Sequence, residues 1–206
     1  MKPESVILLH GLLMRRPALW PLARRLKRRG FATLMFPYAS QLQSPARAME
    51  RLAMTLYALA PGPVHIVAHS LGGLIALETL NQYQRLPPGR VVCLGSPLAG
   101  SAAARGLAGH NLGWLAGKSG PLLRGGLMQV PANREIAVIA GAKSMGLGKY
   151  FGRFDGLNDG TVAVWETRLP GLSEHLVLPV SHSAMIFSEQ VAHLAANFLE
   201  SGHFDL

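Results

Sequence analysis

Six short apolar runs alternate with helix-like segments from one end of this 206-residue chain to the other. The runs are apolar at nearly every position, which is typical of strands that are covered on both faces. Strands of that kind, separated by helices, form a mostly parallel sheet between two layers of helices. The sequence therefore predicts an α/β fold with helices on both faces of the sheet, in a single domain over 1–206. The expected strands are 5–9, 32–36, 64–68, 90–95, 135–140 and 175–179, and the expected helices are 17–29, 45–59, 71–84 and 184–200.

The segment 96–130 interrupts this alternation. It holds eight glycines among leucines, alanines and Trp114, so it is too apolar for a solvated linker and too rich in glycine for a firm helix. Segments of this kind beside a site can act as lids. We expect a small cap or lid here, with a surface connection that carries one short helix as the alternative. A second glycine-rich stretch, 141–160, is expected to form a long loop.

Composition excludes several classes of protein. Apolar residues make up 49% of the chain and charged residues 15%, unlike the composition of a disordered protein. No apolar run approaches the ~20 residues that span a membrane, and the first residues lack the pattern of a signal peptide. These observations favour a cytoplasmic protein, with peripheral attachment to a membrane as an open alternative. The oligomeric state stays open.

The net charge of +9 owes much to cations near the N-terminus. Part of this cluster falls on the expected helix 17–29, where it is either the solvated face of the helix or a surface that attracts anionic lipid. No nucleic-acid partner is expected, because no recognition motif or interleaved aromatic pattern accompanies the charge. The early cations are Arg15, Arg16, Arg24, Arg25, Lys27, Arg28 and Arg29.

Residues 64–73, Val-His-Ile-Val-Ala-His-Ser-Leu-Gly-Gly, have the layout of a nucleophile elbow. An apolar strand runs into Ser70, and a helical stretch follows at once. Ala68 and Gly72 are small, as a tight turn requires, because a larger side chain at either position would collide across the turn. The alternative is a serine in an ordinary strand-to-helix turn.

A serine hydroxyl becomes a nucleophile only beside a base that a third group orients. In α/β folds with a nucleophile elbow, the three groups follow one another along the chain in the order serine, acid, histidine. Asp159 is the expected acid, since it lies where a loop meets a new apolar run, and Asp155 is its competitor. His182 is the expected base, since it follows an apolar strand and precedes the last helix. The histidines that fit less well are His10, His65, His69 (whose side chain should point away at the turn), His110, His175, His193 and His203.

The oxyanion of a tetrahedral intermediate needs hydrogen-bond donors. The apolar strand at 5–9 ends in His10-Gly11, and the turn after it can aim the Leu12 N–H at the site. The second donor expected is the Leu71 N–H, directly after the nucleophile.

Together these segments resemble the α/β-hydrolase superfamily, and within it the small bacterial lipases and esterases. The likeness is carried by 6–13, 64–73, 94–101, 158–162 and 181–191. It implies a catalytic triad of Ser70, Asp159 and His182 that acts on carboxylic esters without a cofactor. The chain departs from the common pattern in having Ala68 in place of glycine and in lacking a large cap.

The sequence thus predicts a serine hydrolase that cleaves carboxylic esters through an acyl-enzyme on Ser70. An apolar acyl pocket is expected from Leu13, Met14, Trp20 and Leu98, together with Leu12. With a basic surface, that pocket suggests a small-molecule or lipid ester with a medium or long acyl chain, such as a phospholipid or lysophospholipid.

Two other functions stay open. The same triad can serve an acyltransferase or a thioesterase, or the fold can be non-catalytic and bind a ligand or an anionic membrane surface. No metal site is expected, because the histidines and carboxylates show no ligand-like spacing.

Overall fold

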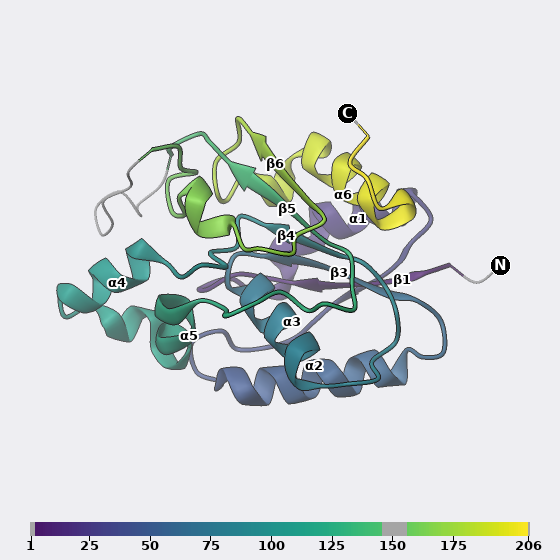
Figure 1. The fold of residues 1–206 in the computed structure, drawn as a ribbon, viewed down its shortest axis with the longest axis horizontal. Coiled ribbons are helices and arrows are strands. Elements are labelled where there is room, and N and C mark those ends of the chain that lie inside the picture. The colour runs from purple at the N-terminus through teal and green to yellow at the C-terminus, as the bar shows by residue number, and fades with distance from the viewer. Residues whose placement is uncertain (1–2, 146–155, 206) are drawn as a thin grey trace.

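The computed structural model describes residues 3–145 and 156–205. Its centre is a sheet of six parallel strands in the order β2-β1-β3-β4-β5-β6 (Figure 1). This architecture confirms the predicted α/β class. The strands are β1 (Ser5–Leu9), β2 (Ala32–Met35), β3 (Val64–His69), β4 (Val91–Leu94), β5 (Ile136–Gly141) and β6 (Glu174–Leu178).

The strand order contains one reversal, and that reversal locates the site. The chain steps outward from β1 to β2, then returns past β1 to β3 and continues through β4, β5 and β6. In open parallel sheets the loops diverge at such a point and leave a crevice beyond the carboxyl ends of the two strands. Here the crevice falls after β1 and β3, where the chain continues into 10–14 and Ser70.

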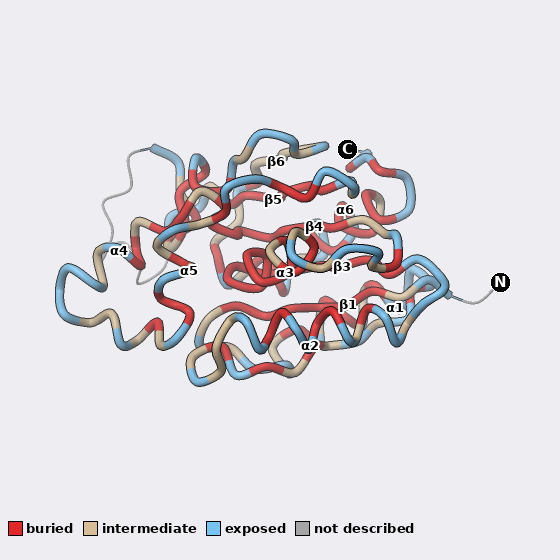
Figure 2. The backbone as a smooth tube through the Cα atoms, turned by 60° about the horizontal axis from the view of Figure 1, so that its bottom comes forward, coloured by how far each residue is buried: buried red, intermediate tan, exposed pale blue. Residues whose placement is uncertain are grey.

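Helices cover both faces of the sheet, as expected. Helices α1 (Trp20–Arg28) and α6 (Glu189–Ser201) pack on one face, and α2 (Pro45–Ala58) and α3 (Leu71–Gln82) pack on the other (Figure 1). Successive residues of β1 point into opposite layers, which is why the run has to be apolar throughout. The inner strands β1, β3, β4 and β5 are buried along nearly their whole length (Figure 2).

Two helices begin later than the sequence predicts. The helix expected from 17 starts with a 3₁₀ turn, Arg16–Leu19, and becomes α1 only at Trp20. Each segment has a proline in its first turn, where the missing N–H is tolerated. The helix expected from 184 is likewise a 3₁₀ turn, Met185–Phe187, followed by α6. Ser188 is extended and its Oγ accepts the N–H of Val191 at 3.2 Å, so it caps a new helix.

The segment 96–130 is more helical than its glycine content suggests. It contains α4 (Ala102–Gly109), a 3₁₀ helix (Gly113–Ser119) and α5 (Gly120–Gly125). The Ser101 Oγ caps α4 by accepting the N–H of Ala104 at 3.1 Å. These short helices project beyond the carboxyl ends of the strands, at the opposite end of the molecule from the N-terminus (Figure 1). No helix in the described ranges is long and apolar enough to cross a membrane.

Candidate active site

Ser70 lies in a strained turn between β3 and α3. Its backbone has φ 55° and ψ −123°, a region that residues with a side chain seldom occupy. Two hydrogen bonds fix this geometry: the Ser70 N–H donates to the Leu94 carbonyl at 2.9 Å, and the Ser70 carbonyl accepts the Gly73 N–H at 3.0 Å. This is the backbone geometry that the elbow motif predicts.

Glycine is required around the turn because other chain segments come close. A Cβ at Gly72 would lie 2.9 Å from the carbonyl oxygens of Leu9 and His10, so the start of α3 presses on the end of β1. A Cβ at Gly11 would lie 3.0 Å from the Cβ of Ser70. Ala68 is fully buried in the core, where a methyl group fits. These contacts bring the loop after β1 directly against the serine.

Asp159 and His182 form a buried pair. The Nδ1 of His182 lies 2.7 Å from the Oδ2 of Asp159, and the His182 N–H donates to the Asp159 carbonyl at 2.9 Å. The other carboxylate oxygen, Oδ1, accepts the N–H groups of Thr161 at 2.9 Å and Val162 at 2.7 Å. A carboxylate only accepts hydrogen bonds, so Nδ1 carries the proton and the neutral ring keeps a lone pair on Nε2.

The serine and this pair share one edge of the sheet. Ser70 follows β3, and His182 follows β6. The link between them is His69, whose Nε2 lies 3.0 Å from the His182 carbonyl oxygen and whose ring centroid is 4.6 Å from that of His182. Within the described ranges, no hydrogen bond joins the Ser70 hydroxyl to the His182 ring. Such contacts are often loose in unliganded enzymes and tighten around substrate. The competing acid, Asp155, lies outside the described residues.

His69 is a contact that the sequence did not predict. Its side chain was expected to point away at the turn, but it is wholly buried and packs on the candidate base. Burial, with a smaller effect of the nearby His182, lowers the pKa of His69 to about 3. The ring is therefore neutral at ordinary pH. Because the His182 carbonyl can only accept, the His69 proton sits on Nε2.

The two N–H groups expected to stabilise an oxyanion belong to Leu71, which directly follows Ser70, and to Leu12. Leu71 is the first residue of α3, where N–H groups have no partner within the helix. Leu12 lines the same cavity as Ser70. Across the described part of the chain, neither the Leu12 nor the Leu71 N–H has a hydrogen-bond acceptor.

The cavity beside Ser70 is small, about 100 Å³. One wall comes from Leu12 and the loop after Asp159, and the remainder comes from the segment 96–130. The lining residues are Leu12, Ser70, Pro97, Ser101, Ala103, Ala104, Leu107, Ala116, Leu123, Thr161 and Val162.

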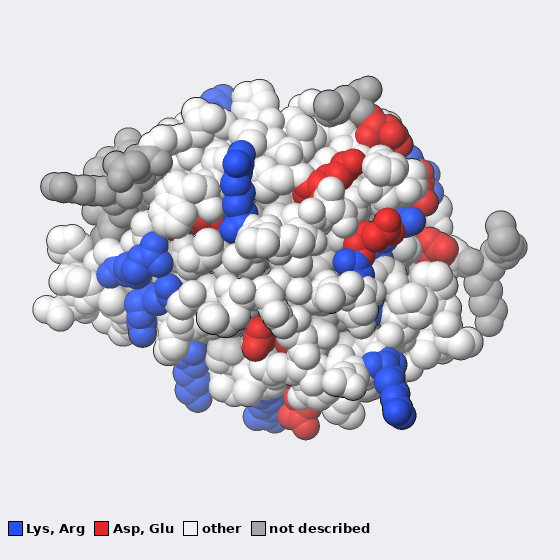
Figure 3. Space-filling view, in the orientation of Figure 1, with Lys and Arg blue, Asp and Glu red and all other residues white. Residues whose placement is uncertain are grey.

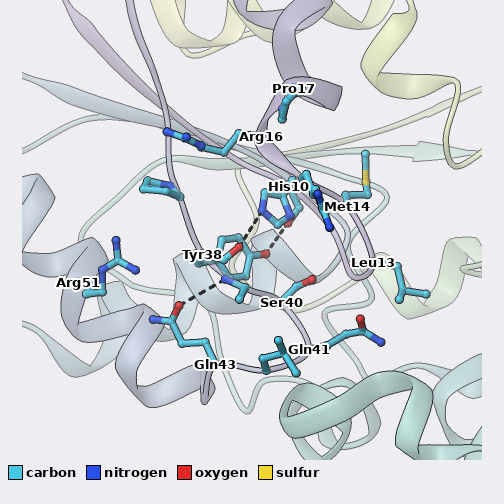
Figure 4. Close-up of a pocket in the computed structure, with 14 residues that line it drawn as sticks. His10, Leu13, Met14, Arg16, Pro17, Tyr38, Ser40, Gln41, Gln43 and Arg51 are labelled. Carbon is cyan, nitrogen blue, oxygen red and sulfur yellow. Dashed lines mark hydrogen bonds between the residues drawn. The ribbon is translucent and has the colours of Figure 1, made fainter.

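Of the residues expected to line an acyl pocket, Leu12 lines the cavity beside Ser70, whereas the other four lie elsewhere. Leu98 is fully buried in the core under α3. Trp20 is 55% exposed and stacks under the Arg24 guanidinium. Leu13 and Met14 line a separate, larger cavity of about 680 Å³, which is formed by the loops after β1 and β2 and by Arg51 of α2 (Figure 4). The sequence did not point to most of the residues that line the cavity beside Ser70, because their positions depend on the packing of short helices, which no local pattern encodes.

Glu166 is another buried polar residue, and no sequence motif predicts its position. It is fully buried, and its carboxylate accepts the N–H groups of Ala102 in the first turn of α4 and of Ala163, the latter at 2.7 Å. The Arg105 guanidinium lies 3.9 Å away. Burial raises the pKa of this carboxyl, against the opposing effect of its hydrogen bonds. Glu166 thus joins α4 to the loop that follows Asp159.

No group of three or more His, Cys, Asp and Glu side chains suited to a metal ion occurs in ranges 3–145 and 156–205. The Asp159–His182 pair can raise the nucleophilicity of the Ser70 hydroxyl, and the Leu12 and Leu71 N–H groups can stabilise negative charge beside it.

Comparison with known proteins adds to this geometry. Residues 6–200 match the sequence model of the alpha/beta hydrolase family. No curated protein matches the chain in sequence.

Solved structures share the fold. The mature lipase BlEst2 of Bacillus licheniformis superposes with a TM-score of 0.73 at 23% identity, covering 97% of this chain and 91% of that one. A metagenomic carboxyl esterase gives 0.68 at 19% identity, covering 90% and 66%. The type II thioesterase BorB of the borrelidin biosynthetic cluster gives 0.63 at 14% identity, covering 96% and 92%. At these identities, the likeness establishes a common fold.

Proposed function

Since the chain belongs to the alpha/beta hydrolase family, we propose that it is a serine hydrolase that cleaves carboxylic esters through an acyl-enzyme on Ser70. The observation that carries this proposal is the 2.7 Å contact between Asp159 Oδ2 and His182 Nδ1, at the edge of the sheet where the strained Ser70 turn lies. That contact leaves the Nε2 lone pair free to take a proton.

The reaction follows from these groups. The Ser70 oxygen attacks the ester carbonyl carbon, and its proton passes to His182 Nε2. The negative charge that develops on the carbonyl oxygen is stabilised by the Leu12 and Leu71 N–H groups, and loss of one such donor typically costs ~100- to 1,000-fold in rate. The intermediate collapses, and the departing alcohol takes the proton from His182. Water, activated by the same imidazole, then hydrolyses the acyl-enzyme.

The acyl group sits in the small cavity under α4. Its volume of about 100 Å³ and its alanine-rich walls suit a short acyl chain. The medium or long chain expected from the sequence has no matching cavity beside Ser70 among the described residues. In this arrangement the segment 96–130 acts as a small cap, because it supplies most of the cavity wall.

A fluorophosphonate probe tests the proposal. We expect the native protein to be labelled and to hydrolyse butanoyl esters, and Ser70→Ala to lose both properties. Ser201→Ala, on the far end of α6, is the matched serine-to-alanine control and should keep both. A native protein that stays unlabelled would favour a non-catalytic binding protein. Labelling that survives in Ser70→Ala would show that another residue reacts with the probe, and it would overturn the assignment of Ser70 as the nucleophile.

Matched oxygen and sulfur esters separate the related activities. We expect hydrolysis of the butanoyl oxygen ester to exceed that of its thioester in kcat/KM. Preference for the thioester would identify a thioesterase, and transfer of the butanoyl group to an added alcohol in place of water would identify an acyltransferase. Either result would leave the nucleophile assignment intact and overturn the ester specificity.

A further inference from the structure

None of the residues that line a large cavity beside the loop after β1 takes part in the chemical steps proposed above. The cavity has a volume of about 680 Å³ and lies between that loop, the loop after β2 and α2 (Figure 4). A neighbouring cavity of about 480 Å³ shares Ala39, Leu42, Gln43 and Arg51 with it. We treat the two together as the basic groove.

Every charged residue that lines the basic groove is a cation. Arg15, Arg16 and Arg51 line the larger part, and Arg47, Arg51 and Lys118 line the smaller part, with no aspartate or glutamate in either. None of these cations has a carboxylate within 4.0 Å in the described ranges. Elsewhere on the molecule, Arg29, Arg90 and Arg105 each have a glutamate partner. The groove therefore concentrates positive charge that no neighbouring side chain neutralises.

The wider charge distribution agrees with this. On the face shown in Figure 3, lysine and arginine side chains lie over α4, α5 and α2, while several acidic side chains lie toward β6 and the C-terminus and others lie near α2 and α3. A cleft lined by one sign of charge raises the local concentration of ions of the other sign.

The wall of the groove also contains a hydrogen-bond donor without an acceptor. The Oε1 of Gln43 accepts the Ala39 N–H at 3.4 Å, but its Nε2 is buried and has no partner in the described part of the protein. The Arg51 guanidinium is held 5.8 Å from the centre of the Phe36 ring. Such a stacked guanidinium is partly ordered before any ligand arrives.

The groove lies next to the nucleophile. A Cβ at Gly11 would lie 3.4 Å from Met14 Sδ, in the groove wall, and 3.0 Å from the Ser70 Cβ. Along the same loop, Leu12 lines the acyl cavity and Leu13 lines the groove. A substrate bound across this loop can place its acyl part on one side and its alcohol part on the other.

From this arrangement we propose that the basic groove binds a phosphate group on the alcohol side of the ester, so that the substrate is a short acyl ester of a small phosphorylated alcohol. This inference rests on the proposed function, since it assigns the second half of the same substrate. Arginine forks match phosphate oxygens in pairs, and several cations favour a doubly charged group over a single carboxylate.

Two esters with the same acyl group test the proposal: butanoyl-glycerol and butanoyl-glycerol phosphate. We expect the native protein to prefer the phosphorylated ester by at least about tenfold in kcat/KM. In the double variant Arg16→Gln/Arg51→Gln this preference should fall by about tenfold or more, chiefly through KM, since hydrogen bonds to charged groups contribute about that much. Absence of a preference in the native protein, or its survival in the variant, would overturn the proposal.

The control removes the same charge elsewhere. Arg24 and Lys27 are exposed on α1 and line neither part of the groove, so Arg24→Gln/Lys27→Gln should retain the preference. An equal loss in this control would mean that net charge, and not the groove, selects the substrate.

A binding measurement separates failure of this inference from failure of the proposed reaction. In Ser70→Ala, glycerol phosphate should raise the melting temperature, and the Arg16 and Arg51 substitutions should remove that rise whether or not any ester is hydrolysed. Lack of stabilisation would overturn the groove assignment. Equal stabilisation by inorganic phosphate, or hydrolysis of the phosphorylated ester only within anionic vesicles, would also overturn it, in favour of a free-phosphate or lipid-headgroup site.

Discussion

Among single residues, Asp159 is the most constrained, because each of its two carboxylate oxygens has its own hydrogen-bond partners. Oδ1 accepts two backbone N–H groups and so anchors the loop, while Oδ2 meets the imidazole. The division of labour means that the loop and the tautomer of His182 can be disturbed separately.

Asp159→Asn should preserve the loop and destroy catalysis. The amide oxygen can still accept the N–H groups of Thr161 and Val162, but the amide NH₂ then faces His182 Nδ1. Nδ1 must become the acceptor, Nε2 becomes a donor, and the ring can no longer take the serine proton. We expect kcat for ester hydrolysis to fall ~10,000-fold with a nearly unchanged circular dichroism spectrum. Asp155→Asn is the control, and a large loss there with little loss at Asp159 would reverse the assignment.

At the scale of elements, α4 presents a small-residue face to the nucleophile. Ala103 and Ala104 are buried and line the cavity beside Ser70, whereas Ala108 on the same helix is exposed. The side chains on the buried face of α4 therefore limit the size of the cavity.

Ala104→Val should shorten the acyl range. Two added methyl groups take up space in a cavity of about 100 Å³, so we expect kcat/KM for butanoyl esters to fall about tenfold more than for acetyl esters, in line with the ~10- to 200-fold that one methylene is worth in a tight pocket. Ala108→Val, the same exchange on the exposed side, should leave the ratio of the two rates unchanged. Proportional loss on both esters in Ala104→Val would mean that the acyl chain lies elsewhere.

At the scale of the whole molecule, several buried histidines link folding to pH. Burial lowers the pKa of His10, His65, His69 and His175, most clearly for His69, which falls from 6.5 to about 3. As the pH falls below about 6.5, these histidines bind protons in the unfolded chain but stay neutral in the folded chain. The stability that depends on neutral histidine is therefore complete above that pH and is lost as the pH falls from 6.5 toward 3.

His69→Gln isolates one part of this effect. Glutamine can still donate to the His182 carbonyl but cannot be protonated. Between pH 7 and 5 we expect the unfolding free energy of the native protein to fall about 2 kcal/mol more than that of the variant, from one group at about 1.4 kcal/mol per pH unit below 6.5. Urea titrations at the two pH values measure this difference, and parallel losses would show that His69 does not control it.

The sequence was most informative where structure is local or ordered along the chain. All six strands were predicted to within about a residue or two. The inner strands β1, β3, β4 and β5 are apolar because they are buried on both faces, and the edge strands β2 and β6 carry a similar pattern although they are only partly buried. The fold's order of serine, acid and base picked out Asp159 and His182, which the structure brings together. The late helix starts at Trp20 and Glu189 were missed because 3₁₀ turns carry the same apolar pattern as the helices they precede.

The cavity walls could not be predicted from the sequence. Leu98 looked like a pocket residue but lies in the core, and Ala104 looked unremarkable but lines the cavity. Their positions depend on how 96–130 packs across the sheet edge. That packing is tertiary, since glycine-rich segments have little helical preference of their own.

Glu166 has a consequence for altering this protein. The Glu166 carboxylate accepts the N–H of Ala102, in the first turn of α4, and the N–H of Ala163, four residues after Asp159, so it connects the wall of the cavity beside Ser70 with the loop that follows Asp159. A broader pocket cannot be obtained by freeing α4 as a unit, since that would also unsettle Asp159. A redesign should instead change the side chains on the face of α4 that lines the cavity, and keep the position of the Ala102 N–H.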